Sequence, residues 1–309
     1  MKKNKYEIDM CNGSIMDKLI TFSLPLMLTS ILQLMFNAVD IIVVGRFSGS
    51  QALAAVGSTT ALINIFTNLF IGISLGANVL AARYFAAGRD REMSEAVHTA
   101  ITLALISGIV MAFVGLGASR AALELMGTPE DVIDQSALYM RIYFMGMPFF
   151  MLYNYGAAIL RAVGDTRRPL FFLGAAGLTN VALDLLLVIV IPLDVAGVAI
   201  GTVASQMISC ILVIRCLCKT EGSYQLHFSK LSIRKVYLIR IFQVGIPAGI
   251  QSTVINFSNA MLQSSVNSFG STAMAGYTAA NNILGFLYAA VNAVTQACMS
   301  FTSGSLRKT

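Results

Sequence analysis

The sequence predicts an all-α polytopic membrane protein with eight transmembrane helices. Of its 309 residues, 56% are hydrophobic and only 12% are charged, which is about half the charged fraction of a soluble domain. The apolar residues form long blocks, and a helix of about 20 apolar residues crosses the hydrocarbon core of a bilayer. The strict alternation typical of a transmembrane β-barrel is absent from the sequence.

Hydropathy places the predicted spans in chain order. A polar segment, 1–18, precedes a first span that is too long for the core of a signal peptide, so we expect this span to stay uncleaved. The longest loop, 219–238, follows the sixth span and is too short for a soluble domain. The eight spans are 19–45, 52–80, 97–118, 137–160, 169–192, 195–218, 239–268 and 272–304.

The distribution of Lys and Arg predicts the orientation of these spans. Alternate loops and the chain ends collect 18 of the 21 basic residues, and the opposite side keeps only Arg46, Arg120 and Arg141. Cytoplasmic loops of membrane proteins carry the excess of Lys and Arg. We therefore expect a protein of the cell (inner) membrane with a cytoplasmic N-terminus. The net charge of +6 then reflects topology, and no nucleic-acid partner is expected.

The seventh and eighth spans resemble the first and second. Both copies are predicted to start on the inside, as in transporter folds whose halves are related by an axis along the membrane normal. We therefore expect 19–218 to form a complete six-helix N-lobe, 219–238 to be a cytoplasmic inter-lobe loop, and 239–309 to supply two helices of a C-lobe. The residues that recur 222 positions later are Pro25, Asn37, Ala38 and Phe47, as Pro247, Asn259, Ala260 and Phe269.

Two carboxylates, Asp40 and Asp184, lie inside apolar spans. A charged Asp near the centre of a membrane helix costs roughly 2.5–3.5 kcal/mol on insertion scales. No Lys, Arg or His lies in the central part of either span, and intramembrane carboxylates usually face a cavity and handle ions or protons. We therefore expect this pair to take up a proton or to bind Na⁺.

Polar neighbours accompany both carboxylates. Asn180 precedes Asp184 by four residues, which places both on one face of the fifth span. Oxygen atoms of Asn180 and of Thr202, in the sixth span, suit a hard cation. The predicted Na⁺ ligands are Asp40, Asn180, Asp184 and Thr202.

Other side chains are candidates for lining a cavity. Asn and Gln on membrane helices also join neighbouring helices by hydrogen bonds, so both interpretations stay open for them. Aromatic and thioether groups near the fourth span could hold flat organic cations, although most such residues pack or face lipid. The candidates are Gln33, Asn37, Tyr139, Tyr143, Met147, Asn256 and Asn259.

Several function classes lack their characteristic residues. The five cysteines include no CxxC pair, and the two histidines, His98 and His227, are far apart. This pattern predicts neither a disulfide framework nor a zinc site. No paired His and Glu metal ligands, Ser-His arrangement or acidic metal-binding motif occurs, so we expect neither an enzyme nor a cofactor.

Four stretches occur in a specific order and spacing: ITFSLPLMLTSILQLMFNAVDIIVVGRFSGSQALAAVG (20–57), SLGANVLAARYFAAGRD (74–90), ILRAVGDTRRPL (159–170) and DVAGVAIGTVASQ (194–206). Together they resemble the prokaryotic multidrug and toxic compound extrusion (MATE) transporters. The resemblance runs from residue 15 to residue 303. It implies a twelve-helix antiporter of two six-helix lobes. Such a protein exports organic cations or drugs in exchange for H⁺ or Na⁺ by alternating access.

The resemblance also implies roles for single residues. Asp40 matches the family's carboxylate on the first helix. Asn180 and Asp184 match a polar pair on the fifth helix of one prokaryotic branch, and Thr202 matches a hydroxyl on the sixth. In that branch, the position of Asn154 lies near the same cation site, so Asn154 joins the cavity candidates.

The chain departs from the family pattern in two places. The sodium-coupled branch carries a glutamate on its seventh helix where this chain has Ile255, which argues against coupling through the second lobe. Family members continue with four more helices after CMSFTSG, so we expect a C-terminally truncated form. The substrate, the coupling ion and the oligomeric state stay open.

Two alternatives to an antiporter stay open. A lipid-linked saccharide flippase of related architecture would need a basic central cavity. It is disfavoured because the Lys and Arg residues within the predicted spans, Arg141, Arg215 and Arg240, all lie within five residues of a span end. A fragment that does not transport is the other alternative.

Overall fold

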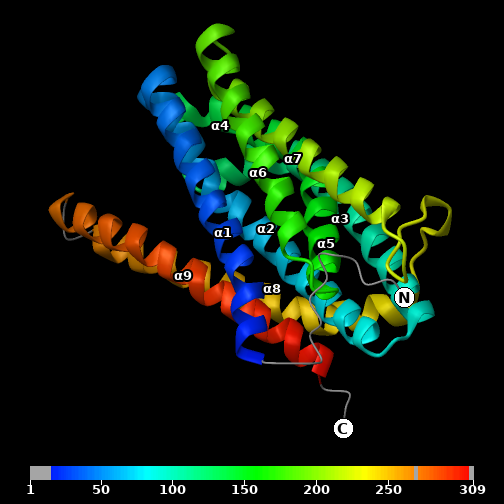
Figure 1. The fold of residues 1–309 in the computed structure, drawn as a ribbon. Coiled ribbons are helices and arrows are strands. Elements are labelled where there is room, and N and C mark those ends of the chain that lie inside the picture. The colour runs from blue at the N-terminus through cyan, green and yellow to red at the C-terminus, as the bar shows by residue number, and fades with distance from the viewer. Residues whose placement is uncertain (1–14, 268–270, 306–309) are drawn as a thin grey trace.

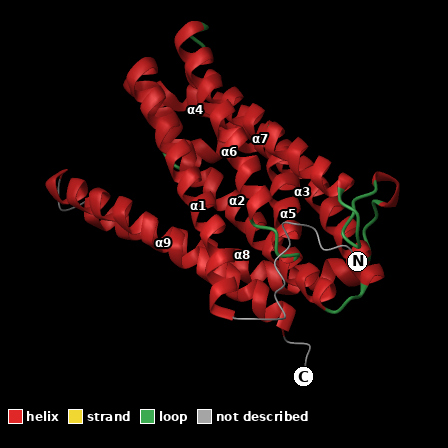
Figure 2. Ribbon diagram, viewed as in Figure 1, coloured by secondary structure: helices red, strands yellow, loops and turns green. Residues whose placement is uncertain are grey.

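The computed structural model describes residues 15–267 and 271–305, which are largely helical and contain no strand (Figure 1, Figure 2). This confirms the predicted all-α class. The α-helices are α1 (Ile15–Val43), α2 (Gly49–Ala86), α3 (Asp90–Leu125), α4 (Glu130–Met145), α5 (Met147–Ala162), α6 (Arg167–Asp184), α7 (Asp194–Lys219), α8 (Lys235–Asn267) and α9 (Ser271–Ser305). Two π-helices, η1 (Val44–Ser48) and η2 (Leu185–Val190), and a 3₁₀-helix, η3 (Phe228–Lys230), lie between them.

Six helical segments in the described part of the chain are long and apolar enough to cross a membrane. They are α1 with η1, α2, α3, α6 with η2, α7 and residues 235–258 of α8. Large apolar side chains such as Phe113, Phe171 and Leu178 are exposed on these helices, as expected of surfaces that face lipid. The chain is therefore a multi-pass membrane protein. The count of eight spans stays a prediction.

The predicted fourth span, 137–160, is divided between two helices. α4 ends at Met145 and α5 begins at Met147, with Gly146 between them. Pro148 occupies the first turn of α5, where its missing N–H group costs no intrahelical hydrogen bond. The same proline would break a continuous helix, so the chain ends one helix and starts another here.

The helices of the predicted repeat pack crosswise. α8 lies against α2, α9 lies against α1, and α2 also contacts α9. Figure 1 shows α8 and α9 running across the lower end of the upright helices. Such an exchange of neighbours fits a two-fold relation between α1–α2 and α8–α9. The Ser300 hydroxyl donates to Asn78 Oδ1 at 3.1 Å, which joins α9 to α2.

α2 and α8 cross at glycines on both helices. A Cβ added at Gly72 would meet the backbone of Gly249, and one added at Gly245 would lie 2.5 Å from Ile73 Cα. Pairs of small residues four positions apart, here Gly72 with Gly76 and Gly245 with Gly249, let the backbones of membrane helices approach closely. The crossing therefore leaves no room for a side chain at these positions.

The main buried core lies among α2, α3, α4, α5 and α7. Phe144, Met147 and Tyr155 are among its largest fully buried side chains. α6 packs against both α1 and α7. This packing brings the two intramembrane carboxylates to the same place.

Candidate functional site

Asp40 of α1 and Asp184 of α6 lie together, with their carboxyl groups in hydrogen-bond contact. Asp184 is completely buried, whereas Asp40 is half-buried. Two carboxyl groups form a hydrogen bond only when one of them carries a proton, since a carboxylate is an acceptor alone. The geometry is therefore suited to holding a positive charge, as a proton or a cation, between the two acids.

Asp184 is held from two sides. The amide nitrogen of Asn180, one turn earlier on α6, lies 3.5 Å from each of its carboxylate oxygens, at the outer limit of a hydrogen bond. On the other side, a Cβ added at Gly201 of α7 would collide with Asp184 Oδ1. The carboxyl group of Asp184 therefore lies between an amide and the bare backbone of α7.

Gly201 was not predicted as a site residue. Its lack of a side chain matters only once α6 and α7 are packed together, and a glycine in a membrane helix has many other uses. The available signal was the spacing of Gly197 and Gly201 in GVAIG, which is typical of a helix face in close contact with another helix.

Thr202 and Asn154, two predicted site residues, use their side chains within their own helices. The Thr202 hydroxyl donates to the Val198 carbonyl at 2.9 Å, and the Asn154 amide donates to the Phe150 carbonyl at 2.8 Å. The structure therefore places Thr202 next to Gly201 without joining it to either acid by a hydrogen bond. Its hydroxyl oxygen keeps acceptor capacity for a cation.

α4 borders the acidic pair with two tyrosines. Tyr139 lies within electrostatic range of both carboxyl groups, and Tyr143 within range of Asp40. The two rings stack with centroids 6.3 Å apart and planes 27° apart, and the Tyr143 hydroxyl is hydrogen-bonded to Gln206 of α7. The pair therefore has aromatic hydroxyl groups on one side.

The remaining cavity candidates differ in their exposure. Met147 is fully buried in the core at the start of α5. Gln33 and Asn37 are exposed on α1, and Asn256 is exposed on α8 with its amide donating to the Ser252 carbonyl. The side chain of Asn259 lies outside the described part of the chain.

One carboxylate oxygen of Asp40 has no hydrogen-bond partner. Asp40 Oδ1 is buried and accepts no hydrogen bond. A buried acceptor without a partner is destabilising by about 1–3 kcal/mol, and most buried polar atoms are satisfied. Within the described residues, no group of three or more His, Cys, Asp or Glu is placed to hold a metal ion, so a bound cation would need amide, hydroxyl or water oxygens as further ligands.

Both acids lie next to irregular helix. η1 begins four residues after Asp40, and η2 begins directly after Asp184; the two π-helices contact each other. π-helices are rare and occur frequently at functional sites. Hydropathy does not predict η2, because its residues, LLLVIV, are as apolar as the rest of the span.

Comparison with known proteins decides the family. The sequence profile of MatE matches residues 25–186, just over half of the chain. The chain belongs to the MatE family. The matched region contains both Asp40 and Asp184, so the acidic pair lies in the part that establishes MatE membership. The predicted resemblance is confirmed.

Curated relatives of this MatE chain carry names from multidrug transport. The chain is 31% identical over 283 residues to the probable multidrug resistance protein YoeA of Bacillus subtilis (strain 168), covering 89% of this chain and 61% of the relative. It is 24% identical over 257 residues to the multidrug export protein MepA of Staphylococcus aureus (strain NCTC 8325 / PS 47), covering 83% and 57%. The chain thus spans about three fifths of the length of the curated relatives it matches.

Solved structures share the fold of this MatE chain. An outward-facing multidrug resistance MATE family transporter of the MOP superfamily superposes with a TM-score of 0.89 at 23% identity, covering 98% of this chain and 67% of the other. A MOP superfamily transporter from Pyrococcus furiosus Vc1 (DSM3638) gives 0.88 at 24% identity, covering 98% and 67%. For that transporter, the reverse polarity of the binding pocket suggests a different function. At these identities the likeness concerns the fold alone.

Proposed function

We propose that this chain belongs to a secondary antiporter that exports organic cations or drugs in exchange for H⁺ or Na⁺ by alternating access. The observation that carries the proposal is the contact between Asp40 and Asp184, buried between membrane helices, with one Asp40 oxygen left without a partner. The names of the curated relatives support drug export. Apart from the coupling ion, no cofactor takes part, and no enzymatic step is involved.

Charge repulsion gives the pair a way to couple ion binding to movement. With a proton or Na⁺ bound, the two carboxyl groups attract a common positive charge and hold α1 against α6. Once the ion leaves, two negative charges face each other in an apolar interior, where repulsion is far stronger than in water. Because Asp184 is fixed between Asn180 and Gly201, Asp40 and its helix α1 are the partner that moves.

Either ion fits this arrangement. A proton needs only the two carboxyl groups. Na⁺ prefers several oxygen ligands, and the Asn180 and Thr202 oxygens would complete its coordination from α6 and α7. Binding of substrate at the aromatic side of the pair, near Tyr139 and Tyr143, would compete with the same ion through cation–π attraction.

The proposed setting is the cell (inner) membrane with a cytoplasmic N-terminus. The end of α2, the start of α3, the end of α7 and the start of α8 carry basic residues, and basic residues gather on the cytoplasmic side. Residues 19–218 would then form the six-helix N-lobe, 219–238 the cytoplasmic loop between lobes, and 239–309 the start of a C-lobe.

The test is efflux of a fluorescent organic cation from proteoliposomes that contain the complete transporter to which this chain belongs, under an imposed Na⁺ or H⁺ gradient. We expect efflux under at least one gradient and a loss of at least about tenfold in Asp40→Asn and in Asp184→Asn. The double variant should be little worse than either single variant, because residues of one site are not additive. Asn37→Ala, one turn away on α1, is the matched control and should keep most of the activity.

Two outcomes would overturn the proposal. One is an absence of gradient-driven efflux by the unsubstituted complete transporter. The other is an efflux rate in Asp40→Asn equal to that of the unsubstituted transporter under both gradients, which would make Asp40 a structural residue.

A further inference from the structure

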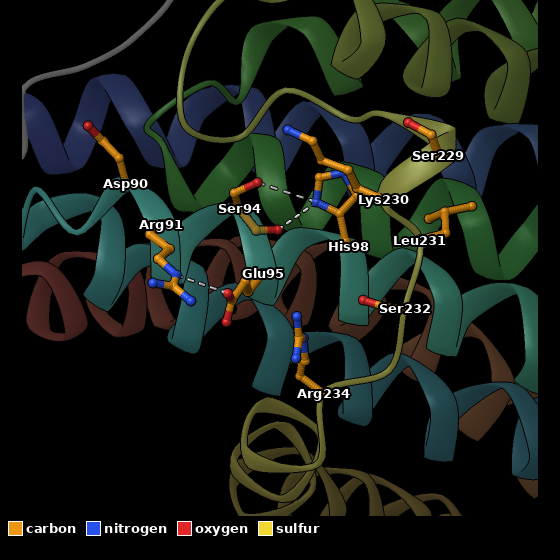
Figure 3. Close-up of a pocket in the computed structure, with 10 residues that line it drawn as sticks. All are labelled: Asp90, Arg91, Ser94, Glu95, His98, Ser229, Lys230, Leu231, Ser232 and Arg234. Carbon is orange, nitrogen blue, oxygen red and sulfur yellow. Dashed lines mark hydrogen bonds and ion pairs between the residues drawn. The ribbon is translucent and has the colours of Figure 1, made fainter.

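A polar cavity of about 640 Å³ lies at the end of the helical bundle where α3 begins (Figure 3). One wall consists of the first turns of α3, and the other consists of residues 229–234, which connect α7 to α8. The proposed antiport does not use this cavity. Because it lies where membrane-spanning helices end, we expect it at the level of the lipid headgroups.

The connecting segment is clamped to α3 at both ends. The backbone N–H of His227 donates to His98 Nε2 at 3.1 Å, and that of Arg234 donates to the Thr99 hydroxyl oxygen at 3.3 Å. His98 Nδ1 in turn lies 2.6 Å from the Ser94 carbonyl, so it carries the imidazole proton and leaves Nε2 as the acceptor. The cavity is thus a preformed feature with fixed walls.

Positive charge exceeds negative charge in the cavity. Arg91, Lys230 and Arg234 line it together with two carboxylates, Asp90 and Glu95. Glu95 is already occupied, with one oxygen 3.2 Å from Arg91 Nε and the other accepting the Tyr237 hydroxyl at 3.0 Å. Asp90 lies in the first turn of α3, where the helix dipole favours a negative charge.

The two other cations are available to a ligand. The charge of Arg234 also acts on Glu95, but neither Lys230 nor Arg234 forms an ion pair within 4 Å in the described part of the chain. Both side chains are exposed. Three serines, Ser94, Ser229 and Ser232, add hydroxyl groups to the same walls. Such a donor set matches the oxygen atoms of a phosphate.

Exposed apolar side chains lie within this segment and directly beside it along the chain. Phe228, Ile233 and Val236 are 64%, 41% and 58% exposed. Basic side chains that line a cavity, next to exposed apolar side chains, are typical of a protein surface at a membrane interface. The acyl chains of a lipid would contact these side chains while its headgroup occupies the cavity.

We propose that the cavity between α3 and residues 229–234 binds the phosphate of an anionic phospholipid headgroup through Lys230 and Arg234. Basic pockets at the ends of membrane helices recognise such headgroups by the attraction between fixed cations and phosphate. A bound headgroup would bridge α3 to the segment that leads into α8. The lipid would thus stabilise the packing of these two helices.

Native mass spectrometry of the full chain in neutral detergent tests the proposal. The probes are dioctanoyl phosphatidylglycerol, dioctanoyl phosphatidylcholine and glycerol 3-phosphate. We expect saturable binding of phosphatidylglycerol, weaker binding of phosphatidylcholine, and no competition by glycerol 3-phosphate at equal concentration. Lys230→Gln/Arg234→Gln should bind phosphatidylglycerol about 30-fold more weakly, the size expected for the loss of two basic residues near an anionic surface.

Two further variants serve as controls. Lys219→Gln/Lys235→Gln removes two exposed cations from the ends of the same connection but outside the cavity, and should bind like the unsubstituted chain. Lys230→Arg/Arg234→Lys keeps both charges and should also bind. Equal losses in the two glutamine variants, unchanged binding in Lys230→Gln/Arg234→Gln, or full displacement of the lipid by glycerol 3-phosphate would each overturn the proposal.

Discussion

The carboxyl group of Asp184 lies against Gly201, in the space that a side chain at position 201 would fill. This contact ties the buried acid of α6 to the backbone of α7. α6 and α7 therefore act as one rigid support for Asp184. Asp40 comes from α1, which packs against α6. The glycine belongs to the candidate site as much as the acid does.

The first prediction concerns this contact. Gly201→Ala should displace the Asp184 carboxyl group and reduce gradient-driven efflux, and the strain of overpacking should cost about 1–3 kcal/mol of stability. Gly174→Ala on α6 is the matched control, because a Cβ there meets nothing within 4 Å. The measurements are efflux rate and unfolding temperature in detergent.

The origin of the effect can be isolated with a second substitution. Asp184→Ala removes the group that a methyl added at Gly201 would strike, so Gly201→Ala should lower the unfolding temperature less in that background than alone. Equal losses in the two backgrounds would show that the strain arises elsewhere on α7.

The second prediction concerns a buried ion pair near the start of α6. Arg168 Nε lies 3.0 Å from Asp165 Oδ2, and the side chains are only 17% and 2% exposed. Asp165→Asn should destabilise the protein by about 3–5 kcal/mol, because it removes the negative charge that offsets the partly buried Arg168 guanidinium. The exposed pair of Arg120 with Glu124 is the control, and Glu124→Gln should cost less than about 1 kcal/mol. Similar unfolding temperatures for the two variants would contradict the assignment of a structural role to the buried pair.

The third prediction concerns the crossing of α2 and α8. A Cβ at Gly249 would lie 2.6 Å from the Leu69 carbonyl oxygen, so Gly249→Ala should push the helices apart and lower the unfolding temperature by an amount equivalent to about 1–3 kcal/mol. Gly285→Ala on α9, where nothing lies within 4 Å, should leave stability unchanged or raise it slightly, since Ala favours a helix. An unfolding temperature for Gly249→Ala that is no lower than that for Gly285→Ala would show that the crossing tolerates separation.

The fourth prediction concerns orientation. In a background without native cysteines, Glu130→Cys at the start of α4 should react with a membrane-impermeant maleimide in intact cells. Glu221→Cys, after the end of α7, should react only once the membrane is permeabilised, because basic loops stay in the cytoplasm. Both positions are exposed, so the opposite pattern would reverse the proposed topology.

Much of the fold and part of the site could be predicted from the sequence. Apolar length gave most helices within a few residues of their ends, because a membrane requires long apolar helices whose backbones bond internally. Helical periodicity placed Asn180 and Asp184 on one face, and the insertion cost of an acid marked Asp40 and Asp184 as a pair. These features depend on composition and spacing along one helix.

Features that depend on contact between helices could not be predicted. Nothing in one span marks Gly201 as the neighbour of an acid, and apolar residues such as those of η2 fit α- and π-helix alike. Met147 has the composition of a cavity residue but lies in the core, because a thioether suits either place. Pro148 signals the break at Gly146, which the apolar length of the fourth span does not show.

The crosswise packing of α8 on α2 has a consequence for the order of synthesis. The glycine face of α2 at Gly72 and Gly76 is complete early, but its partner face at Gly245 and Gly249 is made only after some 170 further residues have entered the membrane. Until then the face of α2 that carries Gly72 and Gly76 contacts lipid or any helix of matching shape. In a neighbouring copy whose α8 is already made, that α8 is a helix of matching shape. Newly made chains can therefore exchange α8 between copies before each α2 packs against the α8 of its own chain.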